Sequence, residues 1–180
     1  MTCQFGTIPD SFQNGVNSQT EVTYVQLQSV QPACRFVGNT MRAYLNLMGI
    51  GRCRLGIYST VNNTTPEYGK LLAQTDIFTT ELDNEYTWYE KQLDRSVILI
   101  PGRSYSFAFF YDAQTASNYV RVASDNDGSI HPYWLVGGDK NDIDDGFLPF
   151  VFYGGSTVST QKEWAVYMIG EQQSPFVTRH

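Results

Sequence analysis

Two acidic runs in the second half of the chain have residue types that bind hard cations. They read SDNDG at 124–128 and GGDKNDIDDG at 137–146. A cation such as Ca²⁺ takes about six to eight oxygen ligands, which loops of Asp, Asn and Gly provide at little steric cost. Neither run has the spacing of an EF-hand, so we expect solvated turns first and a calcium site as the alternative. The candidate ligands are Asp125, Asp127, Asp139, Asp142, Asp144 and Asp145.

Two aromatic pairs are the other candidate binding groups. Trp88 and Tyr89 lie in EYTWYEK, and Tyr133 and Trp134 lie in HPYW, directly before a Val-Gly-Gly stretch. Exposed aromatic rings stack on sugars and anchor protein contacts, whereas buried rings fill cores. Trp88 shares one side of its strand with Glu90, and a charged residue on that side indicates that the side faces solvent. Aromatic residues in strands nevertheless lie in the core more often than at the surface. We therefore expect a core position for Trp88 first, with a glycan or partner platform as the alternative. Tyr133 and Trp134, beside the Val-Gly-Gly stretch, suit either a ligand rim or a subunit contact.

The run MGIGRCRLGIY at 48–58 is the nearest approach to a chemical motif in the first half of the chain. It lacks the third glycine of a dinucleotide fingerprint and the Gly-Lys-Ser/Thr ending of a P-loop. We therefore interpret its glycines as a hairpin turn. Cys53 falls on the apolar side of its strand and is expected in the core, with Arg52 and Arg54 on the opposite face.

Catalytic residues are not predicted. The chain has two histidines, His131 in IHPYW and His180, and acyl transfer needs a base next to a nucleophile. A carboxylate pair of the glycosidase type is the enzymatic alternative, because its geometry cannot be read from sequence. We expect a protein that is not an enzyme and requires no cofactor, with calcium as an optional ligand.

The elements that must position these residues are strands. Alternation with a period of two recurs along the chain, and no convincing helical stripe occurs. In 40–48, for example, Met41, Ala43, Leu45 and Leu47 share one face. In 103–111 the aromatic residues alternate in the same way. The expected strands are 21–28, 40–48, 52–59, 71–78, 85–93, 96–100, 103–111, 118–124, 133–136, 147–153 and 162–170.

Composition favours one all-β domain. The chain has 180 residues, of which 42% are hydrophobic, 14% aromatic and only 17% charged, a balance typical of strands around a sizeable core. We expect an antiparallel, jelly-roll-like β-sandwich of about ten strands. It would occupy residues 21–170, between an N-terminal arm or loop at 1–20 and a C-terminal tail at 171–180.

Charge and hydropathy limit the partners. The formal net charge is −6 and the twelve basic residues are scattered, so we expect no nucleic-acid partner. No apolar run is long enough to span a bilayer, so no membrane partner is expected either. The beginning, MTCQFGTIPDSF, has no basic and apolar leader pattern, which favours a protein that is not exported through a signal peptide. Three cysteines, an odd number, favour reduced thiols over a disulfide framework.

Three stretches carry a resemblance to a known kind of module: RLGIYST at 54–60, GKLLAQTD at 69–76 and VILIPGRSYSFAFF at 97–110. They resemble a jelly-roll-like β-sandwich module of phage virion proteins, which decorate capsids or belong to tails, and of bacterial surface or carbohydrate-binding proteins. The resemblance covers about residues 37–111. It implies a hairpin across Pro101 and Gly102, and it transfers no catalytic residue.

The resemblance implies a structural or attachment role. We expect a non-enzymatic virion protein, a phage capsid decoration or tail-associated component, that contacts other virion proteins and copies of itself as a homo-oligomer and also contacts glycans. The alternative is a carbohydrate-binding or adhesion module of a bacterial surface or secreted protein, located outside the cell or at its surface.

Overall fold

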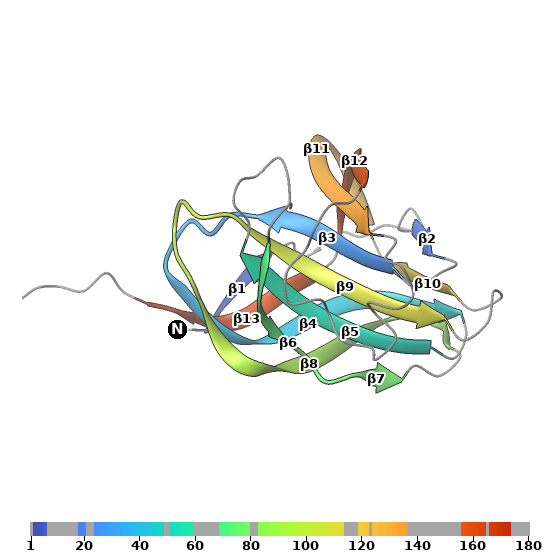
Figure 1. Cartoon of the computed structure of the whole chain (residues 1–180), viewed down its shortest axis with the longest axis horizontal. Coiled ribbons are helices and arrows are strands. Elements are labelled where there is room, and N and C mark those ends of the chain that lie inside the picture. The colour runs from blue at the N-terminus through green and yellow to red at the C-terminus, as the bar shows by residue number, and fades with distance from the viewer. Residues whose placement is uncertain are drawn as a thin grey trace, which may run out of the picture.

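The computed structural model describes residues 2–6, 18–20, 24–48, 51–59, 69–79, 83–113, 119–122, 124–136, 156–164 and 166–173 (Figure 1). These residues form antiparallel strands and no helix, which confirms the all-β prediction. Accordingly, no membrane-spanning helix occurs in the described ranges. The strands are β1 Thr2–Gly6, β2 Ser18–Thr20, β3 Tyr24–Val30, β4 Phe36–Met48, β5 Gly51–Ser59, β6 Lys70–Gln74, β7 Phe78–Thr79, β8 Asp83–Leu99, β9 Tyr105–Ala113, β10 Tyr119–Val122, β11 Ser124–Val136, β12 Ser156–Trp164 and β13 Val166–Gln172.

The first sheet, sheet A, is organised around the long strand β4. Strand β8 pairs with one edge of β4, and β13 and β10 share the opposite edge, with β13 along Phe36–Ala43 and β10 along Leu45–Met48. Strand β1 adds to β13 and β2 adds to β10. Because of these pairings, residues far apart in the sequence lie next to each other on β13, β4 and β8.

The second sheet, sheet B, has the order β12-β11-β3-β9-β5. Both β6 and β7 pair with the remaining edge of β5, β6 with its second half and β7 with its first. In Figure 1, β3, β9 and β5 run side by side across the front of the molecule. The segment after β6 also reaches sheet A, since Thr75 forms an isolated antiparallel bridge with Leu93 of β8.

One hydrophobic cluster includes side chains from both sheets. Sheet A contributes residues such as Met41, Ala43 and Leu45, and sheet B contributes residues such as Leu55 and Phe107. The three residues on β4 are fully buried, as their alternation in the sequence predicts. Cys53 is fully buried in the same cluster, which confirms its predicted core position. Burial also raises the pKa of this thiol.

The predicted hairpin through Gly51 is wrong. Strand β4 belongs to sheet A and β5 to sheet B, so the two strands do not pair and the glycine-containing connection passes from one sheet to the other. The hairpin implied across Pro101 and Gly102 is wrong for the same reason, because β8 and β9 also belong to different sheets. The turn itself is present: Gly102 has φ +76° and the Arg103 N–H donates to the Ile100 carbonyl at 3.2 Å. Only glycine adopts such a φ without strain.

Two strand boundaries also differ from expectation. The segments 85–93 and 96–100 form the single strand β8, which bulges around Leu93 to Ser96 where its register against β4 shifts. Conversely, 162–170 is divided between β12 in sheet B and β13 in sheet A. The predicted strand 147–153 lies outside the described residues.

The predicted arm at 1–20 contains strands β1 and β2 of sheet A, and the ring of Phe5 on β1 packs against Phe107.

Sheet B is shielded from solvent on both faces around β5 and β9. Alternation predicts Arg54, Tyr58, Ser106 and Ala108 on the face opposite the core, yet their exposed fractions are 5%, 1%, 0% and 1%. Burial lowers the pKa of Arg54, and Asp76 and Asp94 oppose this effect by their charge. Burial also raises the pKa of Tyr58. The half-buried strand model therefore fails for the middle of this sheet.

Candidate functional site

An aromatic cluster lies on the face of sheet A opposite the core. We define it as Arg42 and Tyr44 of β4, Tyr86 and Trp88 of β8, and Tyr167 of β13. The strand register assembles it, because Tyr44 pairs directly with Trp88 while Arg42 lies between Tyr167 on one side and Glu90 on the other. Each cluster residue on β4 alternates with a core residue, so the same pleat that buries Met41 and Ala43 directs the cluster side chains to the other face.

The rings of the cluster contact one another in a row. Tyr44 is central to it: its ring stacks on Trp88 with centroids 4.8 Å apart and lies 5.4 Å from Tyr86. Trp88 in turn meets Tyr167 edge-on at 5.4 Å. Each such ring pair adds roughly 0.5–1.5 kcal/mol beyond the area that it buries. Tyr167 is buried at one end of the row, with 3% of its surface exposed, whereas Tyr44, Tyr86 and Trp88 are partly exposed. These three rings are therefore preorganised, with little freedom left to lose on binding.

Arg42 contacts two rings of the cluster, those of Trp88 and Tyr167. Its guanidinium carbon lies over the Trp88 ring at 5.2 Å and over the Tyr167 ring at 5.8 Å. Its Nη1 donates to the Tyr167 hydroxyl at 2.8 Å, and its Nε lies 3.2 Å from a Glu90 carboxylate oxygen. That Nε is buried but not aligned for a hydrogen bond, so we regard the Glu90 contact as an ion pair rather than a hydrogen bond.

The structure separates the predicted pair Trp88 and Tyr89. Trp88 is half-buried on the outer face, where its ring is engaged by Tyr44 and Arg42. Tyr89 points to the other side of β8 and packs partly buried against the hydrophobic cluster, with its ring stacked on Phe78 at 5.7 Å. Of these two predicted platform residues, the structure thus brings only Trp88 to the outer surface.

The second predicted pair, Tyr133 and Trp134, lies on β11, where Trp134 pairs with Leu27 of β3 and with Thr157 of β12. These two residues therefore belong to sheet B and not to the sheet of Trp88. The orientation of their side chains lies outside what the structure describes.

The candidate calcium ligands fall only partly within the described backbone. Asp125 and Asp127 lie on β11, which runs without a break through the stretch expected to be a turn. The register of β11 against β12 shifts between Asn126 and His131, so the irregularity appears as a bulge inside the strand. The remaining candidates, Asp139, Asp142, Asp144 and Asp145, lie outside the described residues. No group of three His, Cys, Asp or Glu suited to a metal was found in the described part.

Sequence reasoning missed Arg42, Tyr44 and Tyr167 as members of a site. The signal that could have found them is their alternation with core residues along their own strands. The pairing of β4 with both β8 and β13, which brings them together, is not encoded locally. The assembled residue types, Trp, Tyr and Arg, are the ones that dominate the energetics of protein interfaces. Neither a protein-family model nor a curated protein gives a significant match to this chain.

Proposed function

We propose that the chain is a non-enzymatic structural or attachment protein of a virion, a phage capsid decoration or tail-associated component. In this proposal the two sheets pack as a jelly-roll-like β-sandwich, as the sequence resemblance implies. The protein acts through contacts with other virion proteins and with copies of itself. The hydrophobic cluster that draws on both sheets supports the sandwich arrangement, because two sheets with apolar faces bury them by packing face to face.

The aromatic cluster is the observation that carries the proposal. Interface hot spots are enriched in Trp, Tyr and Arg, and rigid side chains bind more tightly because less conformational entropy is lost. Trp88 is already stacked on Tyr44 and lies under the Arg42 guanidinium. A partner therefore meets partly exposed rings and a cation whose positions are already fixed, an arrangement that suits a protein surface.

The experiment is sedimentation equilibrium of the purified chain over a wide concentration range, together with binding to purified capsid or tail particles. We expect self-association or docking, weakened at least tenfold by Trp88→Ala and by Tyr44→Ala. The matched control is Gln92→Ala, an exposed residue of the same strand, which should leave association unchanged. Thermal melts confirm that each variant is folded. A chain that stays monomeric and docks on no particle contradicts the proposal.

A carbohydrate-binding or adhesion module at a bacterial surface is the second candidate, and the half-buried ring of Trp88 favours it. A glycan array distinguishes the two functions: a monomeric chain whose glycan binding is lost in Trp88→Ala supports this candidate. Calcium belongs to either proposal as an optional ligand of the acidic runs. A ligand that binds only the folded state raises the melting temperature, so an unchanged melting temperature at millimolar Ca²⁺ removes it.

A further inference from the structure

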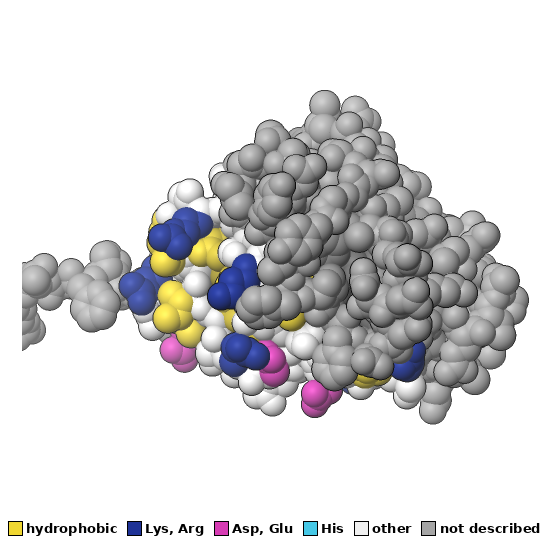
Figure 2. Space-filling view, in the orientation of Figure 1, with side chains coloured by type: hydrophobic (Ala, Val, Ile, Leu, Met, Phe, Trp, Pro, Cys, Tyr) yellow, Lys and Arg dark blue, Asp and Glu magenta, His cyan; other side chains and the backbone are white. Residues whose placement is uncertain are grey.

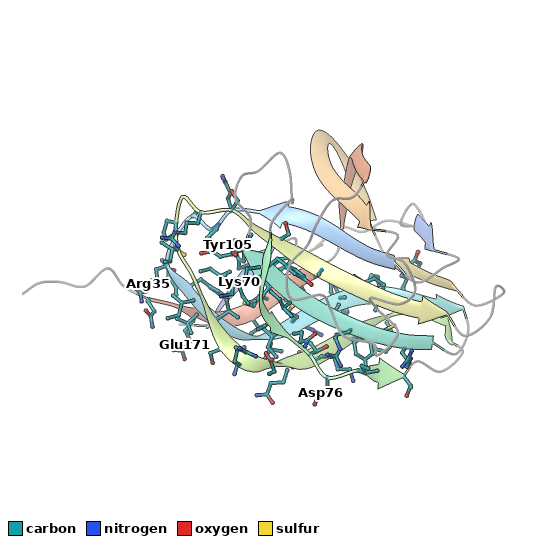
Figure 3. The ribbon with its side chains drawn as sticks, in the orientation of Figure 1. Arg35, Lys70, Asp76, Tyr105 and Glu171 are labelled. Carbon is teal, nitrogen blue, oxygen red and sulfur yellow. The ribbon has the colours of Figure 1, made fainter. Side chains whose placement is uncertain are left out.

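A cavity lies at the opposite end of β8 from the aromatic cluster. It has a volume of about 560 Å³ and is formed where the β8–β9 turn approaches the ends of β5 and β6. Its apolar lining comes from Leu72, Ile98 and Ile100, and Arg103 and Ser59 contribute polar groups. Figure 3 shows Tyr105, which also lines the cavity, at this end of the molecule together with Lys70, Arg35 and Glu171.

The apolar wall of this cavity is unusually open to solvent. Ile98 is 48% exposed and Ile100 is 38% exposed, and they are the exposed large hydrophobic residues found among the described side chains. Val97 and Leu99 alternate with these two isoleucines along the chain and are buried. Large apolar side chains grouped at one cavity mark a contact site more often than an isolated exposed residue does.

The strand that carries Ile98 has an unpaired edge at this point. Within the described residues, β8 pairs with β4 on one side. On its other side the Leu93–Thr75 bridge is the backbone pairing found, and beside it the Gln74 N–H donates to the Asp94 carboxylate at 3.2 Å. The Ile100 N–H is capped by the Tyr105 hydroxyl at 2.9 Å, which marks the end of that edge. The stretch between the bridge and the cap is therefore a template on which an extended peptide can add a strand.

Charge at the cavity favours an acidic occupant. Arg103 lines the cavity, is exposed and takes part in none of the ion pairs found within the described residues. Lys70, also exposed, pairs in register with the cavity residue Ser59. Figure 2 shows several Lys and Arg side chains beside hydrophobic ones at this end of the molecule, with Asp and Glu side chains along its lower side. The same cations would repel each other if two copies of this end met face to face, so a partner with acidic side chains fits better than a second copy.

We propose that this edge and cavity bind an extended, acidic segment of a partner protein by strand addition along β8. One apolar side chain of the segment enters the cavity between Leu72 and Ile98, and a neighbouring carboxylate pairs with Arg103. The site is separate from the aromatic cluster. Disproof of peptide binding here therefore leaves the proposed function standing, and disproof of the proposed function leaves this binding site standing.

The test uses three fluorescein-labelled octapeptides and the full chain. The first alternates valine with glutamate, the second alternates valine with lysine, and the third is the first with proline in place of two central valines. Fluorescence anisotropy should show binding of the acidic peptide, with at least tenfold weaker binding of the other two. Proline removes the donors and the extended pairing that strand addition needs. Absence of binding of the acidic peptide at millimolar concentration overturns the proposal.

Variants identify the site. Ile98→Ser should weaken binding of the acidic peptide at least tenfold, and Arg103→Glu should reverse the preference toward the lysine peptide. The matched control is Arg35→Gln against Arg103→Gln, because both remove one exposed arginine charge, and only Arg103 lines the cavity while Arg35 lies outside β8. Equal effects of these two variants overturn the proposal. Concentration-dependent dimerisation that Ile98→Ser abolishes, without any peptide binding, would replace the partner with a second copy and also overturn it.

Discussion

Thr75 and Leu55 exchange two hydrogen bonds where sheet B approaches sheet A. The Thr75 N–H donates to the Leu55 carbonyl at 2.9 Å, and the Leu55 N–H donates to the Thr75 hydroxyl oxygen at 3.1 Å. The same hydroxyl donates to the Asp76 carbonyl at 2.8 Å. Thr75 is 1% exposed, and its backbone also bridges to Leu93 of β8. One threonine thus satisfies buried polar groups at the point where the two sheets are joined.

Replacing Thr75 with valine should lower the free energy of unfolding by about 1–3 kcal/mol, because the buried Leu55 N–H loses its acceptor while the side-chain volume is retained. Urea denaturation measures the loss. The control is Thr79→Val at an exposed position of β7, which should change stability by less than about 0.5 kcal/mol. Equal effects of the two substitutions would show that the Thr75 hydroxyl is not needed.

Arg42→Lys should destabilise the protein by about 1–2 kcal/mol, since lysine cannot both lie flat on the rings and reach the Tyr167 hydroxyl. A double-mutant cycle with Tyr167→Phe should give a coupling free energy of about 0.5–1.5 kcal/mol. The Arg42–Glu90 pair is partly exposed, with exposed side-chain fractions of 30% and 55%, so Glu90→Gln should cost little. A coupling energy near zero would mean that the two residues act independently.

Gly170→Ala should be far more damaging than Gly38→Ala. A Cβ on Gly170 would meet the Val37 carbonyl and lie 2.6 Å from the Cα of Gly38, where only backbone could move. A Cβ on Gly38 would meet side chains instead, the flexible Met168 with its Cγ at 2.6 Å and the Phe36 ring at 2.7 Å. Overpacking of the flexible kind costs about 1–3 kcal/mol, and we expect Gly170→Ala to exceed that range. Thermal unfolding of both variants measures the order, and the reverse order would contradict the close approach of β4 and β13.

Stability should fall as the pH rises above about 9. Burial raises the pKa of Cys53 above its ordinary value of 9.0 and that of Tyr58 above 10.0. Between the ordinary and the raised pKa, the unfolded chain releases a proton that the folded chain retains, so the unfolded state is favoured by up to about 1.4 kcal/mol per pH unit for each group. Urea titrations from pH 7 to pH 10.5 measure the slope. Cys53→Ala and Tyr58→Phe should each reduce it, and a wild-type stability that stays constant above pH 9 would contradict the prediction.

Burial of a side chain could be predicted from the sequence where it depends on the alternation within a single strand. Met41, Ala43 and Leu45 alternate with Arg42 and Tyr44, and this pattern alone assigns the first three to the core. Cys53 was placed correctly for the same reason. Such arguments need only the period of a strand, which the local sequence contains.

Pairing between strands was not predictable in the same way. The glycines near Gly51 mark a turn, but a turn allows the chain either to return along the same sheet or to pass to another, and the structure shows the second. Trp88 meets Tyr44 and Tyr167 only because β4 lies between β8 and β13, and that register depends on contacts across the whole domain. The burial of Arg54 and Ser106 was missed because alternation cannot reveal that a second face of a sheet is also covered.

The length of β8 has a mechanical consequence. The strand runs from Asp83 to Leu99 and pairs with β4 on both sides of each of its two register shifts. Hydrogen bonds of an antiparallel pair lie perpendicular to the strands, so a pull along β8 loads many of them in shear at once instead of peeling them apart one by one. The force needed to separate β8 from β4 therefore depends on the direction of the load, and it is greatest along the strands.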